Sequence, residues 1–133
     1  MKKAIFMAIV SLALVFTACK DKTVSTQYTI GCLGYQSGMM EDTEWEALEN
    51  YFSTHVDYNK HVVFEGKSLA ENDAQAKALY ESQAEKLDKE YVCSLIGGGD
   101  YFIYGIATVN ADGGYRIIKA MRFQESGTME VED

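Results

Sequence analysis

Basic residues are scarce in this chain of 133 residues. Lysine and arginine number 12 against 20 aspartate and glutamate residues, so the formal net charge at pH 7 is −8. Proteins that bind nucleic acids or anionic lipid surfaces do so through a basic face. The charge balance therefore argues against a nucleic-acid partner. Proline is absent altogether, and we attach no functional consequence to that absence.

Motifs for catalysis and metal binding are also sparse. The two histidines, His55 and His61, form no H-x-x-x-H pair, and the chain has no C-x-x-C pair. In GYQSG, residues 34–38, Ser37 stands one position later than the G-x-S-x-G nucleophile elbow requires. In GGGD, residues 97–100, the glycines follow a predicted helix, whereas a phosphate-binding loop leads into one. We therefore predict no catalytic residues, no metal site and no cofactor.

One long apolar run is present, near the start of the chain. Lys2 and Lys3 precede AIFMAIVSLALVFT, residues 4–17, which carries no charge. As a helix this run would span roughly 21 Å, which is shorter than a bilayer core of roughly 30 Å. A basic start followed by a short apolar segment is typical of a secretory signal peptide. We predict that residues 1–18 are such a signal, with a buried core helix as the alternative.

The apolar run closes on Phe16, Thr17, Ala18 and Cys19. This ending resembles the lipobox of bacterial lipoproteins, in which a small residue precedes a cysteine. The resemblance implies that Cys19 receives a diacylglyceryl group on sulfur and becomes the N-terminus after cleavage. Two or more acyl chains anchor a protein stably in a membrane. The expected location is therefore the cell envelope, at the outer membrane, on its periplasmic or its surface-exposed side.

The remainder of the chain has the size of one domain. Removal of residues 1–18 leaves 115 residues, with ten basic and twenty acidic side chains and a net charge of −10. A chain of this length buries enough surface to fold without a metal or a disulfide framework. We predict a lipidated tether at 19–23, one globular domain at 24–125 and an acidic flexible tail at 126–133.

Two further cysteines, Cys32 and Cys93, lie within the predicted domain. In an oxidising envelope such a pair is a candidate disulfide. A bridge over a loop of this length would stabilise the fold by about 4 kcal/mol on a chain-entropy estimate. Two separately buried thiols are the alternative, and the sequence leaves both open.

Periodicity and capping patterns predict six elements. Alternating side chains indicate strands, apolar residues at helical spacing indicate helices, and the capping boxes at Thr43–Glu46 and Ser68–Glu71 mark two helix starts. The Asp-Gly in NADGG, residues 110–114, predicts a hairpin between the last two strands. The predicted strands are 24–35, 60–66, 101–109 and 115–123, and the predicted helices are 43–55 and 70–93.

The order β-α-β-α-β-β predicts an α+β fold. Each β-α-β step favours a right-handed crossover, so we expect a two-layer sandwich of a four-stranded mixed sheet with both helices on one face. The other face would then be open. The last two strands are apolar on both sides, and the set containing both arginines is our candidate for the open face. Its predicted binding residues are Phe102, Tyr104, Arg116 and Arg122.

The leading functional prediction is a non-catalytic envelope lipoprotein that binds a protein or a glycan through this face. A small envelope hydrolase, or an inhibitor of one, is the alternative from another class. A structural homodimer formed through the sheet is the third. The abundant carboxylates on the helices are read as a solvated face.

Overall fold

The computed structural model of the protein describes residues 23–36, 42–109 and 113–131. These residues form five strands and three helices, so the α+β class is confirmed. The predicted element bounds agree with the structure to within one residue everywhere except in the second helix and the tail. The elements are β1 (Val24–Gln36), α2 (Asp42–His55), β2 (Lys60–Gly66), α3 (Leu69–Ala84), α4 (Lys89–Ser94), β3 (Tyr101–Val109), β4 (Tyr115–Gln124) and β5 (Gly127–Val131).

The long helix predicted at 70–93 is two helices. After α3 ends, Lys86 and Leu87 donate backbone hydrogen bonds to the carbonyls three residues before them. Asp88 then caps α4, because its carboxylate accepts the Tyr91 N–H at 3.1 Å. The apolar stripe runs through this break, and Leu87 stays buried. Periodicity alone therefore could not reveal it.

The sheet has the order β2-β1-β3-β4-β5, and every neighbouring pair is antiparallel. The prediction of a four-stranded mixed sheet was wrong in both strand number and direction. It assumed that each helix carries the chain back past a full strand, so that the next strand runs parallel to the one before the helix. In the structure this holds for β2 and β3, which both run antiparallel to β1 and therefore parallel to each other, but α2 is too short relative to β1 for the same result.

The pairing of β1 shows why. β2 pairs only with the first half of β1, residues 24–30, while Tyr35 in the second half lies against Trp45 of α2, with ring centroids 4.6 Å apart. Thirteen residues of strand extend roughly 43 Å, whereas α2 covers roughly 21 Å of that length. α2 and β2 therefore lie end to end along β1, in the same direction, and β2 is antiparallel to β1.

The fifth strand occupies most of the predicted tail. β5 pairs with residues 120–124 of β4, and Met129 lies opposite Arg122. The tail was predicted to be flexible because it is acidic and short. The strand forms because β4 would otherwise be an edge with unpaired backbone groups.

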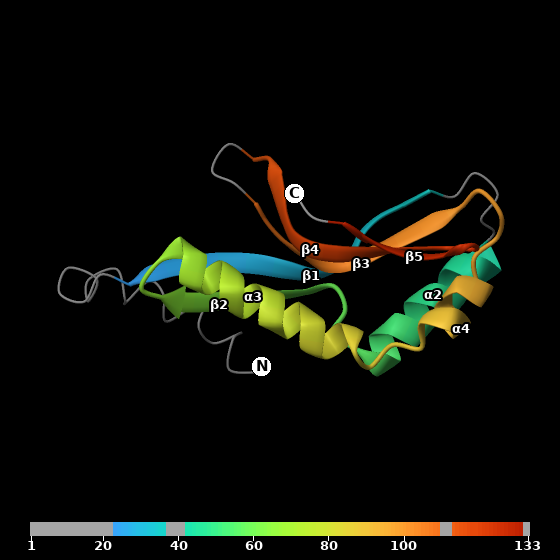
Figure 1. Ribbon diagram of the computed structural model, residues 1–133, viewed down its shortest axis with the longest axis horizontal. Coiled ribbons are helices and arrows are strands. Elements are labelled where there is room, and N and C mark those ends of the chain that lie inside the picture. The colour runs from blue at the N-terminus through green and yellow to red at the C-terminus, as the bar shows by residue number, and fades with distance from the viewer. Residues whose placement is uncertain (1–22, 37–41, 110–112, 132–133) are drawn as a thin grey trace.

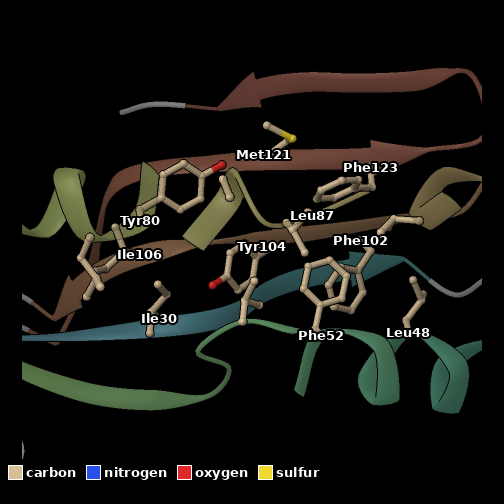
Figure 2. Packing of buried hydrophobic residues seen from close by; sticks show 14 of the residues in the cluster. Ile30, Leu48, Phe52, Tyr80, Leu87, Phe102, Tyr104, Ile106, Met121 and Phe123 are labelled. Carbon is tan, nitrogen blue, oxygen red and sulfur yellow. The ribbon is translucent and has the colours of Figure 1, made fainter. Parts of the chain in front are cut away.

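All three helices pack on one side of the sheet (Figure 1). The core between the layers centres on Phe52 of α2, whose ring lies 4.9 Å from Phe102 and 5.1 Å from Tyr104 between centroids (Figure 2). All three side chains are fully buried. Burial of an aromatic side chain of this size stabilises the folded state by roughly 2–3 kcal/mol, so this cluster is the principal support of the two-layer arrangement.

Candidate binding face on the open side of the sheet

Three of the four predicted binding residues lie on the helix-covered side of the sheet. Phe102 and Tyr104 have no exposed surface, and the Tyr104 hydroxyl donates to the Asp57 carbonyl at 2.7 Å. Arg116 faces α3, where it pairs with Asp73. The prediction that Phe102, Tyr104 and Arg116 form an open face was therefore wrong. Arg122 does lie on the open side.

A bulge in β4 separates the two arginines. The pairing of β3 with β4 shifts register between Ile106 and Ala107, which leaves Ile118 as an extra residue. Because side chains alternate along a strand, one extra residue moves the remainder of the strand to the opposite face. Arg116 and Arg122 would share a face in a regular strand, and the bulge places them on opposite faces.

One end of the open face carries a cluster around Arg122. Ile103 in β3, Arg122 in β4 and Met129 in β5 lie in one row across the sheet. The guanidinium carbon of Arg122 lies 4.0 Å from the centroid of the Tyr101 ring, and its Nε donates to Gln124 Oε1 at 3.1 Å. The Tyr101 ring and the Gln124 side chain together hold the Arg122 guanidinium in place. We call these five residues the Arg122 cluster.

The other end carries a small apolar pocket. Thr29, Ala107 and Ile117 lie in one row across β1, β3 and β4. With Cys32, Leu33 and Tyr115 they line a pocket of about 210 Å³, which we call the Tyr115 pocket. Tyr115 itself is 71% exposed. An exposed tyrosine beside an apolar hollow is a common composition of the centre of a protein interface.

Between these two ends the face has almost no side chains. Gly31, Gly105 and Ala120 lie in one row across the three central strands. A Cβ atom on Gly105 would lie 2.3 Å from the Cβ of Ala120 and 2.6 Å from the Lys119 carbonyl oxygen. This close approach requires glycine. All three residues are buried, and their row lies between the Arg122 cluster and the Tyr115 pocket.

The sequence contains a signal for this orientation of β3. On β3 one set of alternating side chains is Phe102, Tyr104 and Ile106, and the other includes Gly105 and Ala107. A core beneath helices needs side-chain volume, which glycine and alanine do not supply. The large set therefore belongs under the helices, and Tyr101, Ile103, Tyr115 and Ile117 belong to the open side.

Among the residues that the structure describes, neither histidine belongs to a metal-binding cluster. His55 stacks on Tyr51, and its Nδ1 lies 2.7 Å from the Tyr51 carbonyl oxygen. His61 Nδ1 lies 3.0 Å from Thr29 Oγ1. Within residues 23–36, 42–109 and 113–131 no three His, Cys, Asp or Glu side chains gather in a metal-binding arrangement.

Cys32 and Cys93 are both free thiols, so of the two alternatives the separate thiols are present. Cys32 is partly buried beside the register shift of β1, and Cys93 is buried in α4. Burial raises the pKa of the Cys32 thiol to about 11. A thiol with such a pKa is a poor nucleophile at neutral pH.

The described helices include none that is both long and apolar enough to cross a bilayer. Cys19 and the predicted signal lie outside the described residues.

A scan against protein-family models, a search of curated proteins and a search of solved structures all returned no match. The open face combines apolar surface, aromatic rings and one guanidinium.

Proposed function

We propose that this protein is a small lipid-anchored lipoprotein of the cell envelope, and that its domain is a non-catalytic module that binds a partner through the open face. One observation carries the binding role. All the described helices cover the same side of the sheet, while Tyr115, Ile117 and Arg122 stand on the other side at partial or full exposure. An apolar aromatic face with a guanidinium is the composition of an interaction surface.

The two ends of the face indicate the chemistry of the partner. The Tyr115 pocket is apolar and has room for one large side chain. Arg122 offers a planar guanidinium, which suits a carboxylate. Ile103 and Ala107 mark the two ends and are four residues apart on β3, which is roughly 13 Å. The expected ligand is a protein segment with an apolar side chain and a carboxylate at that separation.

The anchor follows from the lipobox-like ending at Cys19. The short predicted tether, residues 19–23, would hold β1 close to the membrane surface. Cys19→Ala should release the protein from the membrane fraction and remove the acyl mass from the mature chain. Membrane retention of the variant at the wild-type level would refute lipidation at this residue.

The binding face is tested by cross-linking the full-length protein in its own envelope and identifying what is captured. Tyr115→Ala and Arg122→Glu should each reduce capture of the same protein at least about tenfold, as expected for interface hot spots. Tyr91→Ala is the matched control, because Tyr91 is also an exposed tyrosine, 47% exposed, but lies on α4 in the helix layer. That variant should capture the partner at the wild-type level.

The same experiment separates the competing partners. If a glycan is captured, and its capture depends on Tyr115 but not on Arg122, the ligand is a sugar stacked on the Tyr115 ring and not a protein segment. Capture of a second copy alone, with a dimer in sedimentation of the lipid-free domain, would make the face a homodimer interface. Capture that is equal in all three variants would refute the open face as the binding surface.

A further inference from the structure

A second candidate site lies on the helix-covered side, remote from the open face. The end of α3, the turn before α4, and strands β4 and β5 enclose a groove of about 640 Å³. We call it the acidic groove, because five carboxylates line it: Glu81, Glu85, Asp88, Glu90 and Glu130. Lys89 and Lys119 are the two cations of the lining. The sum of these charges is −3.

Apolar surface forms the floor of the groove. Ala84 and Leu87 contribute from the α3 end and the turn, and Met121 contributes from β4. Each of these three side chains is at least nine-tenths buried in the fold. The groove therefore has an apolar floor, on which an alkyl chain could lie, and a negatively charged rim.

Tyr80 supplies the observation that points to a ligand. Its side chain is 1% exposed, and among the described residues its hydroxyl oxygen has no hydrogen-bond partner. Tyr80 lines the groove, and its hydroxyl points toward the Met121 side of the floor (Figure 2). A buried hydroxyl without a partner costs free energy, and native proteins rarely retain one. Burial, and then the charges of Glu130 and Glu81, raise the pKa of Tyr80, so its hydroxyl stays neutral.

Lys119 places one alkylammonium group of the protein itself in the groove. Its ammonium lies 3.0 Å from Glu81 Oε2 and 3.4 Å from Glu130 Oε1, so two elements hold one alkylammonium between them. The side chain of Lys119 is only 16% exposed. Glu85 and Glu90 are exposed farther along the rim, and they remain as acceptors for a second cation.

We propose that the acidic groove is a binding site for an alkylammonium ligand, either a free polyamine or a lysine side chain of a peptide. The ammonium groups would be held by Glu85 and Glu90, the methylenes would lie on Leu87 and Met121, and one N–H would donate to the Tyr80 hydroxyl. This site is independent of the open face and of the function proposed for it.

The experiment is calorimetric titration of the full chain in mild detergent with spermidine, and separately with a short lysine-containing peptide. We expect saturable binding of one spermidine per chain. Glu85→Gln with Glu90→Gln should weaken it at least about fivefold. A peptide that binds more tightly than spermidine would assign the lysine side chain of a partner as the source.

Tyr80→Phe distinguishes a ligand site from diffuse attraction to an acidic surface. This variant should bind spermidine about tenfold more weakly, because one hydrogen bond to a charged group is lost. Its thermal stability without ligand should be unchanged or higher, because the hydroxyl it removes has no partner among the described residues. A merely structural Tyr80 would give a less stable variant with unchanged binding.

Glu46→Gln with Glu49→Gln is the matched charge control, because it removes two carboxylates from α2 outside the groove. It should change spermidine affinity by less than about twofold. The proposal is overturned if this control weakens binding as much as the groove variant, if Tyr80→Phe binds like the wild type, or if no saturable binding of either probe is found.

Discussion

The carboxylate of Asp73 in α3 holds the guanidinium of Arg116 in β4 through two hydrogen bonds, from Nη1 to Oδ2 at 2.8 Å and from Nη2 to Oδ1 at 3.2 Å. The hydroxyl of Tyr28 in β1 donates to the same carboxylate at 2.6 Å. Asp73 thus joins three elements that are distant in sequence. Arg116, which was predicted to bind a partner, instead links the sheet to the helix layer.

Asp73→Asn should lower the free energy of unfolding at pH 7 by about 1–2 kcal/mol, because it removes the charge from a bidentate pair. Burial tends to raise the pKa of Asp73, but the hydrogen bonds from Arg116 and Tyr28 outweigh it, and the pKa is lowered. A lowered pKa contributes stability above the unfolded value of about 3.9, and that stability is lost as the pH falls through the folded value.

Urea unfolding of the wild type and of Asp73→Asn at pH 7 and pH 3 checks this prediction. The difference in their free energies of unfolding should be smaller at pH 3. Asp57→Asn is the control, because it breaks the exposed i,i+3 pair with Lys60. That change should cost less than about 0.5 kcal/mol at either pH. A difference for Asp73→Asn that stays constant between the two pH values would contradict the linkage.

Gly105→Ala should destabilise the fold by about 2–3 kcal/mol, because its Cβ would meet the Cβ of Ala120 and the Lys119 carbonyl. Gly34→Ala serves as the comparison, since a Cβ there would only contact Ile103 Cδ1 at 3.8 Å. Thermal melts of the two variants should differ clearly. Equal melting temperatures would mean that β3 and β4 do not approach closely at Gly105.

Cys32 and Cys93 should stay reduced in protein purified without reductant. In a Cys19→Ala chain, which contains no other cysteine, titration of thiols after unfolding should give two per chain. In the folded chain the alkylation rate of Cys32 should be at least about 100-fold below that of a free cysteine at pH 7, because burial raises its pKa to about 11. If no thiol is titrated after unfolding, Cys32 and Cys93 form a disulfide and this prediction is wrong.

Ending the chain after Ser126 should lower the melting temperature by about 5 °C or more, because β5 and its pairing with residues 120–124 are lost. The truncation also removes Glu130, one of the two partners of Lys119. Removal of residues 132–133 alone is the control and should have no effect. If both truncated chains melt like the full chain, the segment is the flexible tail that its composition indicates.

The sequence by itself determined the α+β class, the bounds of most elements and the acidic character of the chain. These follow from local properties: alternation marks strands, helical spacing and capping boxes mark helices, and formal charge is a sum over residues. The hairpin between β3 and β4 is equally local. The structure confirms their antiparallel pairing, although residues 110–112 of the turn lie outside the described residues.

Only the tertiary structure decided which face is open, because both sides of β3 and β4 are apolar and one bulged residue, Ile118, reverses the alternation of side chains along β4. It also decided the direction of β2, which depends on the length of α2 relative to β1. The strand at 127–131 forms because β4 offers it an edge. The Arg122 cluster, the Tyr115 pocket and the acidic groove each join residues from several elements, and their formation depends on packing that no short segment encodes.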